Sequence, residues 1–323
     1  MKAVRVLPHP EGGRVEVQDI PVPQVAEGQV LVRVRASGLN RGEITQSRDR
    51  RTGAPGTLGV EFAGEVSAVG AGVTGWREGD RVMGHGRECQ AEYVLADPLA
   101  LMPVPADLGW IEAASFPNAF VTAHDAVITN GQLQPGESIL VNGASGGVAW
   151  AALQIASLWG AKPVIATSRS AAKLDKLFEY GIDVGIDTSR ESLLDGIMRA
   201  TDKRGVDLII DMVGGPAFED NVRGLAIGGR LVNIARLGGQ TAQIDLEQLW
   251  LKRLKLIGVT FRTRSEQERL ACIQACARDM LPFLQEGRIR WAIDRTFSLE
   301  EIHAAHAYMM KGEHSGKIVL TID

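Results

Sequence analysis

The chain has 323 residues, of which 45% are apolar and 23% are charged. This length exceeds the size at which a single hydrophobic core stops growing, so we expect two domains. A net charge of −4 provides no basic field for nucleic acid or an anionic membrane surface. Composition therefore excludes the nucleic-acid-binding classes and favours a small-molecule partner.

Cysteine usage indicates a reducing compartment. The three thiols, Cys89, Cys272 and Cys276, contain no CxxC pair, which argues against a disulfide scaffold and against a four-thiolate zinc site. The opening MKAVRVL alternates like a strand and lacks the long apolar stretch of a signal peptide. We expect a cytoplasmic protein.

Residues 138–161 carry no charge, so a hydropathy window flags them as a candidate membrane span. The run contains Asn142, Gly143, Gly146 and Gly147, which break an apolar helix. A strand, a tight glycine turn and a buried helix explain this pattern better. We expect no membrane association.

The part of the chain up to Pro117 is β-rich. Short alternating runs separated by Gly and Pro are typical of antiparallel strands. Residues 1–117 are therefore expected to form a compact antiparallel or partly closed barrel. The expected strands cover residues 14–20, 29–37, 58–70, 80–84 and 91–96.

From residue 118 onward, apolar strands alternate with helices. Near-continuous Val, Ile and Leu runs with intervening helices are typical of a parallel sheet covered on both faces. Residues 118–260 are therefore expected to form a doubly wound α/β domain. Its strands are expected at 138–143, 163–168, 184–187, 206–211 and 230–235.

The last segment, 261–323, returns to β character after a long helix expected over 265–286. A strand over 291–297 and a helix over 299–311 are expected to precede a final strand over 316–322. This order predicts that the C-terminus rejoins the first domain.

The strongest local motif is VNGASGGVAW, a glycine-rich turn between a strand and a helix. Gly143 lets the chain turn, and Gly146 and Gly147 let the backbone approach a pyrophosphate at the helix N-terminus. A purely structural turn is the alternative, but the position between strand and helix favours a dinucleotide site. The predicted cofactor-binding residues of this turn are Gly143, Ala144, Ser145, Gly146, Gly147 and Val148.

The end of the next strand indicates which dinucleotide is bound. A protein that selects NAD usually places Asp or Glu there, but no carboxylate occurs before Asp175. Ser168, Arg169 and Lys173 can all donate to a 2′-phosphate, so NADPH is the predicted cofactor. The alternative is that Arg169 and Lys173 form a solvated helix face.

Several motifs along the chain resemble the medium-chain dehydrogenase/reductase superfamily, and within it the zinc-free quinone oxidoreductase branch. The resemblance implies a GroES-like barrel made from both chain ends, an inserted Rossmann domain, an active site in the cleft and dimers formed through the Rossmann domain. The matching segments are ASGLNRGEI at 36–44, GVEFAGEVSAVGAGV at 59–73, FVTAHDAV at 120–127 and the terminal HSGKIVL.

Zinc members of this family need a separate check, because a catalytic zinc keeps three protein ligands and one open position. Asn40 occupies the position of a ligand Cys, and Val60 replaces the His of the usual GHE, leaving only Glu61. The structural-zinc lobe is reduced to residues 84–90. In that loop His85 and Cys89 are interpreted as ordinary loop residues, so no metal is expected.

The resemblance also implies individual site residues. Asn40 is the candidate catalytic group, because its amide can donate to a substrate carbonyl and bond the nicotinamide ribose. A turn Asn that ends its strand is the alternative. The further cofactor-binding positions implied by the family are Thr122, Val213, Ala235, Arg236, Phe261 and Lys317.

The segment that follows Asn40 bears on the acceptor. Many enoyl reductases of the family carry a proton-donating Tyr there, but this segment reads TQSRDRRTGAPG. No side chain stands out as a general acid, so solvent could supply the proton. Arg48, Arg50 and Arg51 are expected to form a solvated loop, with attraction of an anionic substrate as the alternative.

The predicted function is NADPH-dependent hydride transfer to a quinone or to an α,β-unsaturated carbonyl, without zinc, by a homodimer. The alternatives are a zinc-free enoyl-thioester reductase, an alcohol or aldehyde reductase with or without zinc, and a non-catalytic NADPH-binding sensor.

Overall fold

The structure is a computed structural model that describes residues 1–144 and 146–323. The chain forms two compact units. Unit 1 contains Met1–Asn118 together with Leu270–Asp323, and unit 2 contains Ala119–Arg269.

Unit 1 is built from two sheets. The smaller sheet has the order β2-β1-β4, and the larger has the order β15-β16-β3-β5-β6-β8 with β7 also paired to β3. The strands are β1 (Lys2–Leu7), β2 (Arg14–Asp19), β3 (Val30–Leu39), β4 (Gly56–Thr57), β5 (Glu61–Val69), β6 (Arg81–His85), β7 (Tyr93–Ala96), β8 (Leu101–Pro103), β15 (Ile293–Ser298) and β16 (Lys317–Thr321). The predicted β-rich character of this part is confirmed.

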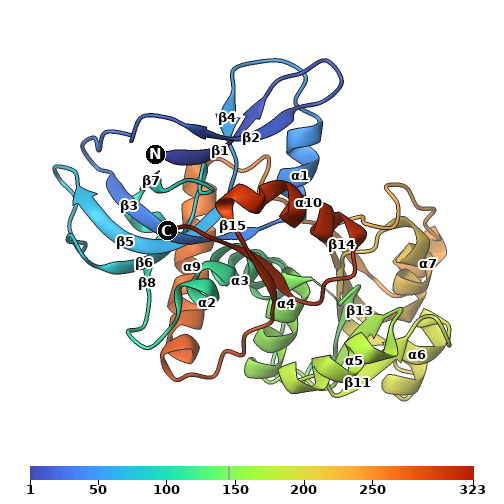
Figure 1. Ribbon diagram of the computed structural model, residues 1–323. Coiled ribbons are helices and arrows are strands. Elements are labelled where there is room, and N and C mark those ends of the chain that lie inside the picture. Colours follow the sequence, from blue (N-terminus) through green and yellow to red (C-terminus); the bar gives the residue numbers. More distant parts are fainter. Residues whose placement is uncertain (145) are drawn as a thin grey trace. The chain divides into compact units, whose positions relative to one another are not determined.

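The C-terminal strand lies within the N-terminal sheet. β16 pairs antiparallel with β3, where Ile318 faces Leu39 and Thr321 faces Ala36. Figure 1 shows this red strand beside the blue strand β3. The last strand of the chain therefore belongs to the same sheet as β3.

Alternating apolar residues of these strands form the core of unit 1. Val30, Val32 and Val34 of β3 pack with Ile318 and Leu320 of β16, and all five are buried. Each such side chain contributes about 1.5–3 kcal/mol when it leaves water. This burial fixes the register of β3, and with it the position of the residues just after the strand.

Helices complete unit 1. Both α3 and α9 cross the division between the two units. The helices are α1 (Arg41–Arg48), η1 (Pro98–Ala100), α2 (Trp110–Ser115), α3 (Pro117–His124), α9 (Glu266–Gln285), η4 (Leu299–Glu301) and α10 (Ile302–Lys311).

Unit 2 contains a six-stranded parallel sheet with the order β11-β10-β9-β12-β13-β14. In chain order within the unit this reads 3-2-1-4-5-6, the doubly wound arrangement whose crevice lies at the carboxyl ends of the strands. The predicted α/β fold class is confirmed. The strands are β9 (Ile139–Asn142), β10 (Val164–Ser168), β11 (Val184–Asp187), β12 (Val206–Asp211), β13 (Leu225–Asn233) and β14 (Lys255–Gly258).

Helices join these strands and are coloured green to yellow in Figure 1 where they follow β9, β10 and β11. The segment after α3 is the π-helical turn η2 (Asp125–Asn130). The other helices of unit 2 are α4 (Gly147–Leu158), α5 (Ala171–Leu177), η3 (Phe178–Tyr180), α6 (Leu193–Ala200), α7 (Gly215–Gly224) and α8 (Leu246–Leu251).

The uncharged run at 138–161 and strand β13 differ in how closely they follow the sequence expectations. The uncharged run 138–161 forms β9 and the 12-residue α4, and no helix within the described ranges is long and apolar enough to cross a bilayer. The strand predicted over 230–235 begins five residues earlier, at Leu225. Its first part pairs with Val206 before a register shift, and the glycine pair Gly228 and Gly229 hides this part from pattern reading.

Candidate functional site

A buried polar network lies at the end of β3 in unit 1. Asn40 follows this strand and caps α1 in an extended conformation. Its backbone N–H donates to Glu43 Oε2 at 3.0 Å, so the carboxylate satisfies a donor at the helix start. The capped turn holds the Asn40 side chain at the C-terminal end of β3.

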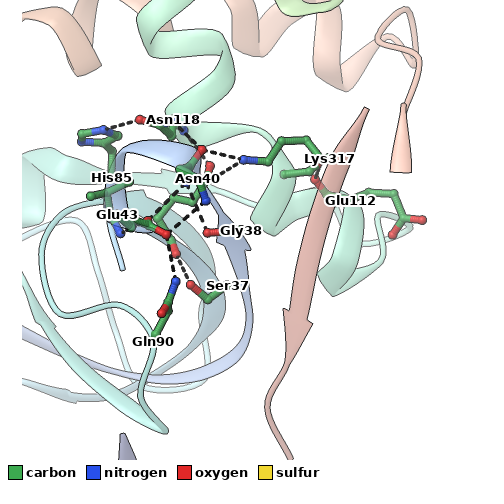
Figure 2. A network of polar contacts seen from close by, with 12 residues as sticks. Ser37, Gly38, Asn40, Glu43, His85, Gln90, Glu112, Asn118 and Lys317 are labelled. Atoms are coloured by element: carbon green, nitrogen blue, oxygen red, sulfur yellow. Dashed lines mark hydrogen bonds and ion pairs between the residues drawn. The ribbon is translucent and has the colours of Figure 1, made fainter. Parts of the chain in front are cut away.

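Both ends of the Asn40 amide are engaged within unit 1 (Figure 2). Its Oδ1 accepts from Asn118 Nδ2 at 2.8 Å and from Lys317 Nζ at 3.0 Å. Its Nδ2 donates to Glu61 Oε1 at 2.8 Å and lies 3.3 Å from Gly38 O and from Glu43 Oε1. The two amide hydrogens therefore face three protein acceptors.

Lys317 and Glu61 form the charged centre of this network. Lys317 on β16 makes a short ion pair with Glu61 Oε1 on β5, and their side chains are only 8% and 0% exposed. Glu61 Oε2 also accepts the backbone N–H of Asn118 at 2.8 Å. A Cβ at Gly38 would stand 2.2 Å from Glu61 Oε1, so only glycine at this position leaves room for the carboxylate.

Glu43 is a second buried carboxyl group beside this ion pair. It accepts from Val60 N at 3.1 Å and from Gln90 Nε2 at 2.9 Å. Burial raises the pKa of Glu43 to about 7, against the hydrogen bond from Asn40 and with a further contribution from the charge of Glu61. Glu43 therefore titrates near neutral pH.

His85, which the sequence left as a loop residue, ends β6 and is buried. Its Nε2 lies 3.1 Å from Asn118 Oδ1. Because the amide nitrogen of Asn118 donates to Asn40, its oxygen must accept, and His85 Nε2 carries the hydrogen. His85 and Asn118 thereby fix the orientation of the Asn40 amide.

The glycine turn of unit 2 joins β9 to α4. Gly143 has φ +84°, and its N–H donates to Thr167 Oγ1 at 2.9 Å. A Cβ there would meet Val213 Cγ2 at 3.0 Å, whereas a Cβ at Gly146, the N-cap of α4, would meet nothing within 4 Å. Of the predicted turn residues, Ser145 lies outside the described residues.

Polar side chains stand at the carboxyl ends of the neighbouring strands. Thr167 Oγ1 donates to Asn142 Oδ1 at 2.6 Å, and Asn142 Nδ2 donates to Asn221 at 3.2 Å. Asp211, which is fully buried, accepts from the N–H groups of Val213 and Gly214 and from the Asn233 amide. These bonds fix the loops that follow β9, β10 and β12.

The predicted cofactor residues fall into two groups. Most of them follow β9, β10, β12, β13 or β14, whose carboxyl ends share one edge of the parallel sheet in unit 2, while Thr122 lies in α3. Asn40 and Lys317 belong to unit 1, where they contact each other. The unit 2 edge positions are Gly143, Ala144, Gly146, Gly147, Val148, Ser168, Arg169, Lys173, Val213, Ala235, Arg236 and Phe261.

Phe261 lies in a supported loop. The guanidinium of Arg264 stands 4.9 Å from the centre of the Phe261 ring and donates to Asp125 Oδ2 at 2.7 Å. Asp125 begins η2 and is 1% exposed. This buried ion pair holds the loop after β14 against the start of the π-helical turn.

The turn in unit 2 fits a dinucleotide. The left-handed Gly143, the open space at Gly146 and the first N–H groups of the 12-residue α4 provide the backbone approach that a pyrophosphate needs. No group of three or more His, Cys, Asp or Glu side chains suited to a metal ion occurs among residues 1–144 and 146–323.

Sequence reasoning missed Glu43, Asn118 and Gln90 as members of the network. The Asn40-x-x-Glu43 spacing resembles a capping box and is the one signal that could have indicated Glu43. Asn118 and Gln90 reach the network only through the fold of unit 1, and no local pattern marks them.

Comparison with known proteins agrees with this architecture. A model of the alcohol dehydrogenase GroES-like domain matches residues 26–129, and a model described as zinc-binding dehydrogenase matches residues 147–276. Quinone oxidoreductase-like protein 2 of Bos taurus is 31% identical over 95% of this chain and 88% of its own length. Human quinone oxidoreductase is 30% identical over 100% of this chain and 98% of its own length.

Among solved structures, the CurK enoyl reductase matches with a TM-score of 0.83 and 26% identity, covering 99% of each chain. The relatives are oxidoreductases, and the family implies a nicotinamide cofactor and a small-molecule substrate. The chain therefore belongs to the medium-chain dehydrogenase/reductase superfamily, in its quinone oxidoreductase-like branch.

Proposed function

We propose that this oxidoreductase uses NADPH, without zinc, to reduce a quinone or the β-carbon of an α,β-unsaturated carbonyl compound. The observation that carries the proposal is the network around Asn40, where the ammonium of Lys317 bonds a side chain that stands at a zinc-ligand position in related enzymes. Val60, at the second such position, has no side-chain ligand atom.

NADPH is favoured over NADH by the end of β10. Ser168 is the last residue of this strand, Arg169 is exposed beyond it, and Lys173 lies in the first turn of α5. These three donors face no Asp or Glu at the position that would accept from a ribose 2′-hydroxyl. An arginine can bind a 2′-phosphate through two parallel hydrogen bonds.

The variant Arg169→Ala tests this choice. We expect the KM for NADPH to rise about tenfold, equivalent to ~1.4 kcal/mol, while the KM for NADH changes little. Lys176→Ala, on an exposed position of the same helix, is the matched control. An unchanged NADPH KM, or a wild-type preference for NADH, contradicts the assignment.

The glycine turn would hold the pyrophosphate through the backbone of Gly143, Ala144, Gly146, Gly147 and Val148, with Ser145 completing the turn in sequence. Val213, Ala235, Arg236 and Phe261 would surround the nicotinamide end, together with Thr122 of the same unit. When bound, the cofactor supplies a hydride. The protein binds and orients the acceptor, excludes water and stabilises negative charge on its oxygen.

A steady-state screen of NADPH oxidation tests the proposed function directly. We expect turnover with quinones or enones, and metal analysis of the active enzyme with less than about 0.1 zinc per chain. Stoichiometric zinc with alcohol dehydrogenase activity contradicts the proposal. Bound NADPH without turnover of any acceptor leaves a non-catalytic sensor.

Enoyl-thioester reduction is the second candidate, because the CurK enoyl reductase shares this architecture over 99% of the chain. The sequence after Asn40 lacks the tyrosine that many such enzymes carry. Enoyl thioesters therefore belong in the same screen, and a kcat/KM above that for enones would favour this candidate.

We further propose a homodimer formed through unit 2. The edge strand β14 and the helix α8 expose Leu246, Trp250, Leu251 and Leu256, with Trp250 73% exposed. An uncovered apolar edge strand is a pairing surface. Sedimentation is expected to show a dimer for the wild type and a monomer for Leu256→Lys, and a monomeric wild type contradicts the proposal.

A further inference from the structure

Lys317 is a buried cation that has more N–H groups than acceptors among the described residues. Its ammonium carries three N–H bonds, and the part of the chain that the structure describes gives it two acceptors, Glu61 Oε1 and Asn40 Oδ1. We propose that the third N–H of Lys317 donates to the substrate oxygen and stabilises the oxyanion that hydride addition creates. This inference rests on the proposed function.

The Asn40 amide is less suited to that donation. Its two hydrogens already face Glu61, Gly38 and Glu43, so donation to a substrate requires the loss of a protein hydrogen bond. Its oxygen instead accepts from Lys317 Nζ. Asn40 is thus a positioning residue that, together with Glu61, aims the ammonium group.

The position of Asn40 Oδ1 is itself fixed. Asn118 donates to it at 2.8 Å, and His85 holds the opposite end of the Asn118 amide at 3.1 Å. As Figure 2 shows, the Lys317 side chain extends from the C-terminal strand to meet this array. Such preorganised donors in a water-poor site are worth far more than the same groups in water.

Lys317 keeps its positive charge throughout the proposed reduction. The bound dinucleotide would supply a hydride by breaking one of its own C–H bonds, and the two electrons would form a new C–H bond at the β-carbon. The carbon–carbon π pair shifts to the bond between the α-carbon and the carbonyl carbon, and the carbonyl π pair moves to the oxygen, which becomes an enolate oxyanion. The acceptor is reduced and the dinucleotide oxidised. The oxyanion accepts the Lys317 hydrogen bond, and solvent delivers the final proton to the α-carbon.

A purely structural role is the competing explanation, in which Lys317 only neutralises the buried Glu61. The two explanations predict different kcat values for the double variant that combines Lys317→Met with Glu61→Gln. Lys317→Met alone leaves Glu61 buried without a cation, which destabilises the fold. Adding Glu61→Gln removes that charge, so the thermal midpoint of the double variant should recover toward the wild type.

At saturating NADPH, we expect Lys317→Met to lower kcat with a simple enone about 100-fold, and the double variant to remain equally slow although it is stable. Recovery of kcat together with stability overturns the inference. So does a variant in which only the KM for NADPH rises, because Lys317 would then be a cofactor contact.

An acceptor series separates stabilisation of charge from general damage. The deficit of the double variant should be about 100-fold for simple enones and about 10-fold for quinones with electron-withdrawing substituents, because their oxyanions are less basic and need less stabilisation. A deficit that is the same for all acceptors overturns the inference.

The control is Arg35→Met with Glu65→Gln, which removes a half-buried ion pair that joins β3 to β5 outside the network. Its kcat should equal that of the wild type. If the wild type binds NADPH but reduces no enone or quinone, the proposed function fails and this inference fails with it. If the wild type is active and Lys317→Met is equally active, the inference alone fails.

Discussion

The polar interiors of the two units are built from different groups. In unit 1, the network buries a lysine and two glutamates, Lys317, Glu61 and Glu43. In unit 2, the network at the strand ends consists of the uncharged Asn142 and Thr167 and of a single carboxylate, Asp211, that is bonded to backbone N–H groups.

This difference in polar groups corresponds to two different functions of the units. Neutral side chains that bond to backbone groups fix loop conformations, and a dinucleotide is bound largely by such backbone groups. Buried charges are costly unless they are paired, so a site that keeps them is suited to the stabilisation of changing charge. We therefore propose that unit 2 supplies the cofactor geometry and unit 1 the charge stabilisation, and three variants test this division.

Asp211→Ala is expected to have the largest effect. Its loss leaves the N–H groups of Val213 and Gly214 and the amide of Asn233 without their acceptor in a buried loop. Such groups cost about 1–3 kcal/mol each, so unfolding of unit 2 should become easier by roughly 4 kcal/mol. Urea denaturation measures this change. Asp175→Ala, at an exposed position of α5, is the control. An equal loss of unfolding free energy in the two variants contradicts the role proposed for Asp211.

Glu43→Gln tests the charged network through pH. The folded pKa of about 7 lies above the ordinary value of 4.5. The contribution of Glu43 is therefore fully present below pH 4.5 and is lost as the pH rises through 7. Between pH 5 and pH 8 the wild type should lose on the order of 3 kcal/mol more than the variant.

Thermal midpoints of both proteins at pH 5 and pH 8 give the comparison. Glu78→Gln, at an exposed position of unit 1, should follow the wild type at both values. If the thermal midpoint changes equally in the wild type and in Glu43→Gln between pH 5 and pH 8, Glu43 is ionised throughout this range and the prediction is contradicted.

Thr167→Val is expected to have the smallest effect of the three. The hydroxyl accepts from Gly143 N and donates to Asn142, so its removal should cost about 2 kcal/mol and raise the NADPH dissociation constant several-fold. Thr188→Val is the control, because that hydroxyl makes one longer bond, of 3.3 Å, to Ser168 O. Unchanged NADPH binding in Thr167→Val would separate this network from the cofactor.

The sequence alone determined the fold class and the position of the glycine turn. Apolar strands alternating with helices repeat in a local pattern, and a parallel sheet is the arrangement that buries both of their faces. The strands at 184–187 and 206–211 have the predicted bounds. The strand that contains Gly228 and Gly229 was truncated in the prediction, because glycine carries no side-chain pattern.

Only the tertiary structure decided the composition of the polar network. Asn40, Glu61, Asn118 and Lys317 are separated by up to 277 positions in sequence, and they meet because β16 pairs with β3 and β3 pairs with β5. Local pattern describes what a segment buries, but it does not describe which distant side chains share the space. The resemblance to the family implied that Lys317 is a cofactor residue, whereas its ion pair with Glu61 forms only because the two ends of the chain share one sheet.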